Sequence, residues 1–298
     1  GMGGLATFET AVLTGAERGP GRVSPFSVPM IMPNAGAAAV SLRLGWQGPC
    51  ETVTTACAAG THGVGNGARA VATGVCDVVL AGASDASLVG TTIAGFTNAG
   101  AMSRSGISRP FDRERDGFAA GEGAALLLLE PLDAALARGA RVYAVIEGAA
   151  SGADAFHVTA PSPGGVGAQR CMRQALADAG LTAADVRHVN AHGTSTPLND
   201  AAEASAVTAV LGERGAPVTS VKGVTGHGLG AAGALEAAAV CLSIERRTLP
   251  PTAGYAEPDD DTRGLDVVTT ARAWEPGPVL SNSFGFGGHN GTLVITPV

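Results

Sequence analysis

The chain has 298 residues, of which 45% are apolar and 15% charged, with 44 glycines and a formal net charge of −7. This composition excludes a disordered chain, which needs low hydrophobicity and high net charge. The negative charge also argues against sequence-independent binding to nucleic acid or to an anionic membrane.

The first predicted elements lie between residues 51 and 82. Glu51 to Ala56 is short and rich in β-branched residues, which is typical of a buried strand. Residues 61–74 predict an alanine-rich helix that ends at Gly74, and Asp77 to Gly82 predicts a second buried strand. A strand, a helix and a strand within about thirty residues indicate a βαβ unit with parallel strands.

The alternation of strands and helices then recurs through the rest of the chain. Further strands are expected at 124–130, 142–148, 186–190, 218–221, 279–284 and 291–296, and further helices at 166–180, 200–211 and from the TGHGLG turn to about residue 246. Two successive sets predict a duplicated, layered α/β architecture with halves at 1–150 and 151–298. Pro161 to Gly165 is the one plausible seam between them.

Cys57 lies in the segment TACAAG, where the first predicted strand turns into a helix. Free N–H groups and the positive dipole end at a helix N-terminus favour thiolate over thiol. The alternative is a buried structural cysteine, because cysteine is among the most interior residue types. The five cysteines are scattered and include no C-x-x-C pair, which predicts neither a disulfide framework nor a zinc site.

Three glycine-rich segments follow predicted strands, and ligands bind at the carboxyl ends of strands in open α/β sheets. They are NAHGTSTP with His192, KGVTGHGLG with Lys222 and His227, and NSFGFGGHN with Phe286. Lys222 is the only lysine in the chain, and a lysine can carry a tuned, compact charge. Each segment also has an interpretation without a catalytic role. His192 can cap the next helix, Lys222 can be solvated, Thr194 and Thr196 can be ordinary turn residues, and NSFGFGGHN can form a glycine-rich hairpin.

Taken in order, TACAAG, NAHGTSTPLND, KGVTGHGLGAAGALE and NSFGFGGHNGTL resemble the motifs of β-ketoacyl-[acyl carrier protein] synthases of the elongating type. SRPFDRERDGFAAGEGAALLLLE is similar to the family's segment between its two halves, so the resemblance covers essentially the whole chain. It implies a thiolase-like duplicated α-β-α-β-α fold and the decarboxylative Claisen condensation of malonyl-[acyl carrier protein] with a cysteine-bound acyl chain. It also implies an acyl carrier protein as partner, and neither a metal nor an organic cofactor.

The resemblance implies a role for each matching residue. Cys57 accepts the acyl chain, while His192 and His227 promote decarboxylation and stabilise the enolate. Lys222 orders the histidine pair, and Phe286 is a gate whose N–H forms the oxyanion hole together with that of Cys57. Thr194 and Thr196 hydrogen-bond the pantetheine arm, and Phe96 lines the acyl pocket. The carboxylates of Asp200, Glu203 and Glu236 form hydrogen bonds around the two histidines and the lysine.

The sequence also departs from the family pattern. That pattern starts on the order of a hundred residues before the first residue here, so we expect the N-terminal half of the fold to lack strands. Unpaired buried backbone groups cost about 1–3 kcal/mol each, and we therefore expect the chain alone not to be a competent enzyme. TNAGAM, after Phe96, lacks a basic residue that often faces the acidic carrier protein, and Arg18 and Arg22 are candidates to replace it.

Other readings remain open at this point. The two-histidine set argues against initiating synthases, and the absence of a cysteine after Cys241 argues against a thiolase. The pathway is fatty-acid or polyketide synthesis, and the alternative function is a catalytically incompetent or carrier-binding subunit related to chain-length factors. We expect a homodimer, or a heterodimer with a related subunit, that pairs through the β-branched edge at 51–56 or its neighbour. No apolar run long enough to span a bilayer and no secretory signal are visible, so we expect a cytoplasmic protein.

Overall fold

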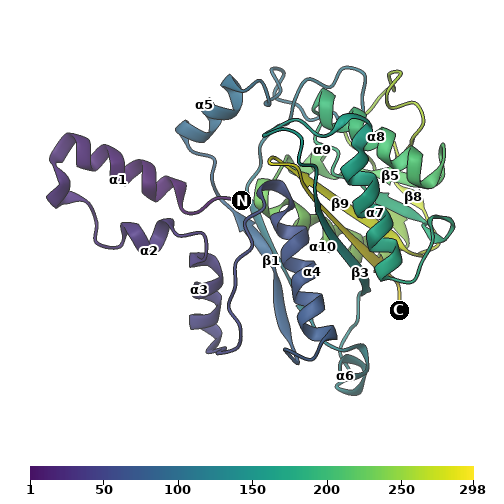
Figure 1. Cartoon of the computed structure of the whole chain (residues 1–298), viewed down its shortest axis with the longest axis horizontal. Coiled ribbons are helices and arrows are strands. Elements are labelled where there is room, and N and C mark those ends of the chain that lie inside the picture. Colours follow the sequence, from purple (N-terminus) through teal and green to yellow (C-terminus); the bar gives the residue numbers. More distant parts are fainter.

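The computed structural model describes all 298 residues and arranges them around two main β-sheets (Figure 1). The larger sheet has six strands in the spatial order β3-β10-β9-β4-β5-β7. Their bounds are β3 Val145–Ala153, β4 His188–Asn190, β5 Pro217–Thr219, β7 Asp266–Val267, β9 Val279–Gly285 and β10 His289–Thr296. Strands β9, β4, β5 and β7 run parallel, whereas β10 is antiparallel to both of its neighbours. Helices on both faces bury the parallel strands, as such sheets require.

The smaller sheet pairs β1 (Val79–Asp85) with β2 (Gly123–Leu129) in an antiparallel arrangement. Helices α4 (Ala59–Ala72) and α10 (Ala232–Arg246) contact strands of both sheets and form a layer between them. Small residues permit this packing, because a Cβ added to Gly60 would lie 2.6 Å from the backbone nitrogen of Ala234. Part of the high glycine content therefore serves close backbone approach at the centre of the fold.

Helices α7 (Val166–Asp178) and α8 (Pro197–Leu211) lie side by side, and α7 packs on β3, β9 and β10 (Figure 1). The main core beneath them includes Met172, Val189 and Leu280, which are fully buried. The shorter elements are α5 Gly90–Asn98, α6 Leu132–Ala137, α9 Lys222–Thr225, β6 Thr248–Leu249 and β8 Arg272–Ala273. None of the helices combines the length and the apolar character that crossing a membrane requires.

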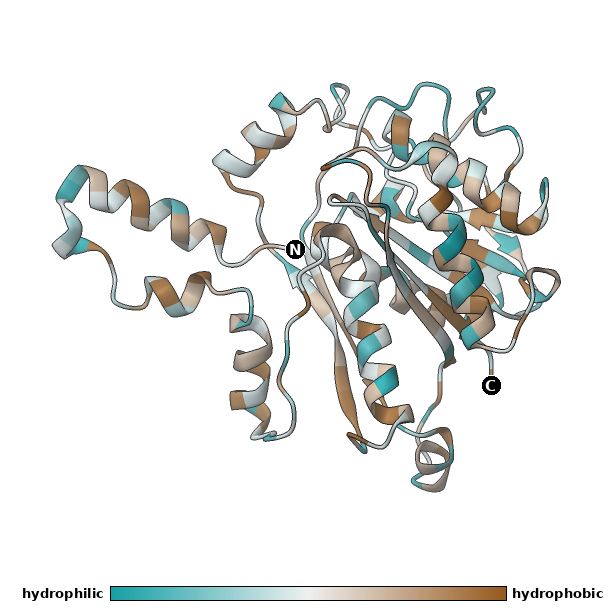
Figure 2. Cartoon of the chain, in the orientation of Figure 1, coloured by the Kyte–Doolittle hydropathy of each residue, from teal (hydrophilic) through white to brown (hydrophobic).

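Residues 1–50 form an arm that lies beside the body of the molecule, in purple in Figure 1. It contains α1 (Leu5–Arg18), α2 (Ser27–Ile31) and α3 (Ala35–Leu44). Figure 2 shows apolar residues in brown along these helices and along β1 and β2. Many of their large apolar side chains are exposed: Phe8, Val12, Leu13, Phe26, Val28, Met30, Leu42, Leu126 and Leu128. The arm and the smaller sheet thus present an extensive apolar surface.

Most predicted elements are confirmed, with bounds shifted by a few residues. The helix expected at 61–74 is α4, and those at 166–180 and 200–211 are α7 and α8. The predicted strands from residue 77 onward correspond to β1, β2, β3, β4, β5, β9 and β10. The division expected at residue 150 falls within β3, which belongs to the larger sheet, and the two-half division stays a prediction. The helices of the arm were not predicted.

The strand predicted at Glu51 to Ala56 is wrong. This segment belongs to no sheet, and none of its residues is fully buried. The βαβ unit is therefore absent too, and β1 pairs antiparallel with β2 instead. A run of β-branched residues favours extended backbone, but a strand also needs a neighbour to accept its hydrogen bonds, and that neighbour is not a local property of the sequence.

Candidate active site

Cys57 lies in the 3₁₀ turn Ala56–Ala58, directly before α4. The residue before it, Ala56, has a φ of +49°, a left-handed conformation that non-glycine residues rarely adopt. Such strained backbone clusters at functional sites, where it aims a side chain in a fixed direction. Here the turn places Cys57 on the wall of a cavity of about 330 Å³.

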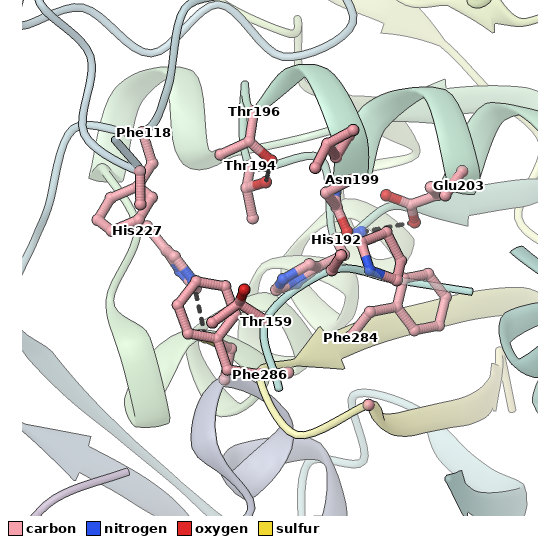
Figure 3. Close-up of a pocket in the computed structure, with 18 of the residues that line it drawn as sticks. Phe118, Thr159, His192, Thr194, Thr196, Asn199, Glu203, His227, Phe284 and Phe286 are labelled. Atoms are coloured by element: carbon pink, nitrogen blue, oxygen red, sulfur yellow. Dashed lines mark hydrogen bonds between the residues drawn. The ribbon is translucent and has the colours of Figure 1, made fainter. Parts of the chain in front are cut away.

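Two histidines from distant segments meet Cys57 in this cavity (Figure 3). His192 follows β4, and His227 follows α9, where its backbone pairs with Ala119 and Gly121. The Nε2 atom of His227 is 3.1 Å from Sγ of Cys57. The two imidazole rings are nearly perpendicular, with centroids 5.3 Å apart. The ligating atoms of all three side chains lie within 4.8 Å of one another, so one small group can contact all of them.

Lys222 lies behind the histidine pair and is almost completely buried. Its Nζ donates a hydrogen bond to the backbone oxygen of His192 at 2.5 Å and forms an ion pair with Glu236 of α10. The same Nζ is 3.5 Å from Nδ1 of His192. An ammonium beside Nδ1 favours the tautomer with its proton on Nε2, the nitrogen that faces the cavity.

Burial sets the protonation states of the three reactive groups. It lowers the pKa of His192 and His227 well below the usual range, and the charge of Lys222 lowers both further, so both rings are neutral. Burial raises the pKa of Cys57 to about 11, outweighing Lys222 and the N–H of Phe286, which both lower it. At this pKa the resting group is a thiol, because burial outweighs the tendency toward thiolate that is expected at a helix N-terminus. His227, at hydrogen-bond distance, is the base that can accept the thiol proton.

The raised pKa of Cys57 predicts slow, strongly pH-dependent alkylation of this thiol. With a pKa of about 11, only about one molecule in a thousand carries the thiolate at pH 8. The rate of modification by iodoacetamide should rise almost tenfold per pH unit between pH 7 and pH 10. Mass spectrometry of the Cys57 peptide measures this rate, with the exposed Cys50 as an internal reference. A rate that levels off by pH 8 would contradict the prediction.

Two buried carboxylates of α8 hold the loop that carries His192. Glu203 accepts hydrogen bonds from the backbone N–H of His192 at 2.8 Å and of Gly193 at 2.7 Å. Asp200 accepts from the N–H of Ser195 and from that of Phe111, the latter at 2.7 Å. Burial raises the pKa of Asp200 to about 6 and that of Glu203 to about 7. These contacts fix the backbone, so both carboxylates act on the site through the loop.

The wall of the cavity carries both polar and aromatic side chains (Figure 3). The hydroxyls of Thr194 and Thr196 are 3.0 Å apart, and both residues line the cavity. Phe96 of α5 lies edge-on to Phe118, and Phe118 lies edge-on to His227 with ring centroids 5.3 Å apart. Phe118 therefore shapes the surroundings of a reactive histidine.

Phe286 lines the cavity from the loop between β9 and β10, and its backbone N–H lowers the pKa of the Cys57 thiol. The end of β9 reaches the nucleophile turn only because residue 285 is glycine. A Cβ there would lie 2.8 Å from the backbone oxygen of Thr55 and 3.0 Å from the nitrogen of Cys57.

Most of the predicted site residues share this one cavity. It is lined by Cys57, Phe96, His192, Thr194, Thr196, Glu203, His227 and Phe286, while Asp200, Lys222 and Glu236 stand behind it. Arg18 and Arg22 lie on the arm and do not line the cavity. Sequence reasoning missed Phe118 and Phe284, whose side chains carry no reactive group, although they lie in the quoted segments SRPFDRERDGFAAGEGAALLLLE and NSFGFGGHNGTL.

Comparison with known proteins supports one family over nearly the whole chain. The family model for the N-terminal domain of beta-ketoacyl synthases matches residues 1–135, and that for the C-terminal domain matches residues 143–256. The chain is 42% identical to 3-oxoacyl-[acyl-carrier-protein] synthase 2 of Synechocystis sp., covering 98% of this chain and 72% of that one. It is 43% identical to the protein of the same name from Staphylococcus aureus, covering 99% and 74%.

Solved structures agree with these sequence matches. One is a type II polyketide acyl-carrier protein in complex with its ketosynthase bound to the hexaketide, with a TM-score of 0.94 and 34% identity over 98% of this chain and 75% of that one. The ishigamide ketosynthase/chain length factor has a TM-score of 0.93 and 36% identity, covering 98% and 72%. A beta-ketoacyl synthase from Burkholderia phymatum has a TM-score of 0.93 and 38% identity, covering 100% and 73%.

Proposed function

Because the chain belongs to the β-ketoacyl synthase family, with its thiolase-like fold and its activity as a 3-oxoacyl-[acyl carrier protein] synthase, we propose how its own residues divide the reaction. The proposal rests on one observation above all. Cys57, His192 and His227 converge on one cavity that Phe286 also lines.

The first half-reaction is acyl transfer to Cys57. His227 accepts the thiol proton as Sγ attacks the carbonyl carbon of an acyl thioester. The N–H groups of Cys57 and Phe286 donate hydrogen bonds to the resulting oxyanion. When the tetrahedral intermediate collapses, the thiol of the donor leaves with the proton, and the acyl chain remains on Cys57.

The second half-reaction forms the carbon–carbon bond. A malonyl thioester loses CO₂, and the electron pair of the broken bond forms an enolate at the thioester oxygen. The neutral imidazole of His192 donates a hydrogen bond to that oxygen from Nε2. His227 donates a second one as the tautomer that carries its proton on Nε2, which is the opposite of the tautomer that accepts the thiol proton in the first half-reaction. The enolate carbon then attacks the carbonyl of the acyl-Cys57 thioester, and the Cys57 thiolate leaves and takes up one proton from solvent, the proton that the decarboxylation consumes.

The supporting residues act by holding these groups in place. Lys222, with Glu236, holds the backbone and the tautomer of His192. Thr194 and Thr196, which line the cavity, offer hydroxyls to the amides of a pantetheine arm. Phe96 lines the same cavity and offers an apolar surface to the acyl chain.

The partner of this reaction is an acyl carrier protein, and a second ketosynthase-like subunit completes the assembly. The curated relatives are named for an acyl carrier protein, and one structural relative is a ketosynthase in complex with one. Another is a ketosynthase paired with a chain length factor. The exposed apolar surface of the arm and of β2 fits a homodimer or a heterodimer with such a subunit. A cytoplasmic location fits an enzyme that works on carrier-bound substrates.

A purified-protein assay tests the proposed division of labour. Because this chain brings Cys57, His192 and His227 into one cavity, the protein should be active, against the expectation drawn from the missing strands. Supplied with an acyl- and a malonyl-[acyl carrier protein], it should release one CO₂ for each 3-oxoacyl product formed. Mass spectrometry should detect the acyl group on Cys57 before malonyl thioester is added. Binding of the carrier protein without acylation of Cys57 would instead favour a carrier-binding subunit without catalytic activity. Comparing fatty-acyl donors with polyketide donors in the same assay would distinguish fatty-acid synthesis from polyketide synthesis.

A further inference from the structure

His62 is a buried residue of α4 that joins the two segments carrying the reactive groups. Its Nδ1 is 2.7 Å from Oγ1 of Thr55, and its Nε2 is 3.0 Å from the backbone oxygen of Asn290. Thr55 lies two residues before Cys57, and Asn290 lies four residues after Phe286 at the start of β10. One side chain thus contacts both the nucleophile turn and the strand behind the gate.

The direction of these two hydrogen bonds follows from the chemistry of the partners. A backbone carbonyl can only accept, so Nε2 of His62 carries a proton and donates it to Asn290. Burial lowers the pKa of His62 and keeps the ring neutral, which leaves Nδ1 as an acceptor for the hydroxyl of Thr55. Both nitrogens are therefore used, each toward a different segment.

The backbone around His62 is shaped to bring these segments together. A Cβ at position 291 would lie 3.0 Å from Cδ2 and from Nε2 of His62, so glycine is needed for the ring to pack against β10. A second tie runs beside it, where Oγ1 of Thr61 is 2.7 Å from Oγ of Ser283 in β9. The start of α4 is thus held against both strands that flank the gate loop.

We propose that His62 is a positioning residue that sets the placement of the Cys57 sulfur relative to the N–H of Phe286. Its hydrogen bond to Thr55 orients the nucleophile turn, and its hydrogen bond to Asn290 places the gate loop that supplies this donor. The inference rests on the oxyanion-hole role proposed for Phe286. A displacement of about 1 Å at such a site can cost about a hundredfold in rate.

Two substitutions separate the two bonds. In His62→Asn, the side-chain oxygen lies near the former Nδ1 and can still accept from Thr55, but the bond to Asn290 is lost. In His62→Gln, the side-chain nitrogen lies near the former Nε2 and can still donate to Asn290, but the bond to Thr55 is lost. Two rates are measured by mass spectrometry: acyl transfer from an acyl-[acyl carrier protein] onto Cys57, which uses the oxyanion hole, and alkylation of Cys57 by iodoacetamide, which does not.

His62→Asn should slow acyl transfer about tenfold or more and should slow alkylation by a clearly smaller factor, which reflects only the effect of the Phe286 N–H on the pKa of Cys57. His62→Gln should slow both reactions. Thr55→Val removes the same hydrogen bond from its other end, so it should reproduce the effect of His62→Gln, and the double variant should be no slower than either single one. His188→Gln is the matched control, because His188 is a buried histidine with a hydrogen bond to Thr219 and does not line the cavity. It should lower thermal stability without changing either rate.

A purely structural role for His62 predicts a different result. In that case both His62 variants would keep wild-type rates, or would lose both rates in proportion to their loss of thermal stability, and the proposal would be overturned. If the wild-type protein itself transferred no acyl group to Cys57, this result would contradict the proposed function and not the role of His62. The alkylation rates of His62→Gln and Thr55→Val would then still show whether His62 orients Cys57.

Discussion

Replacing Cys57 by alanine is expected to lower the rate of 3-oxoacyl product formation by about 10⁴-fold or more, because no other group in the cavity can hold the acyl chain. The fold should survive, since Cys57 is a small, partly buried side chain in a turn and contributes little to the main cores. Product formation is measured by mass spectrometry and the fold by thermal melting.

A second variant and a control sharpen this result. Cys57→Gln should still release CO₂ from a malonyl thioester without forming the condensation product, because His192 and His227 remain to stabilise the enolate. Cys171→Ala changes a buried cysteine outside the cavity and should leave the condensation rate unchanged. Appreciable condensation product from Cys57→Ala would rule out the covalent mechanism.

The sequence allowed most of the reactive groups to be found because each lies in a local motif. His192, His227 and Phe286 sit in three glycine-rich segments beside predicted strands, and a resemblance over these segments and TACAAG implied that they share a site with Cys57. The structure brings Cys57, His192 and His227 within contact of one small group. The structure also shows that Lys222 and Glu236 form a buried ion pair, and their separation of fourteen residues in the sequence does not predict this contact.

What the sequence could not supply depends on contacts between distant segments. Glu51 to Ala56 has the composition of a strand but no strand beside it. The helix N-terminus at Cys57 favours a thiolate, yet burial by residues far along the chain reverses the outcome. His62 links two parts of the site through its hydrogen bond to Asn290, which is 228 residues away in the sequence. Phe118 has no reactive group and becomes relevant only through its edge-on contact with His227.

Lys222→Met is expected to destabilise the protein by about 3–5 kcal/mol and to stop decarboxylation almost completely. The variant leaves Glu236 buried without its partner, and an unpaired buried charge is costly. His192 also loses the hydrogen bond to its backbone oxygen and the ammonium beside Nδ1. Urea denaturation measures the stability, and CO₂ release from a malonyl thioester measures the second effect.

The stability of this variant should also depend on pH in a defined direction. Burial already raises the pKa of Glu236 to about 7, with Lys222 pulling it down, so removal of Lys222 raises this pKa further. The folded state then binds a proton that the unfolded state, with a carboxyl pKa near 4.5, has released. Stability is therefore highest below about pH 4.5 and falls as the pH rises through 7, so Lys222→Met should unfold at lower urea concentration at pH 8 than at pH 5.5. Lys222→Met combined with Glu236→Gln removes this titrating group and should show a smaller difference, because only Asp200 and Glu203, whose pKa values burial also raises, still lower the stability over this pH range. An equal pH dependence in the double variant would place its origin outside the Lys222–Glu236 pair.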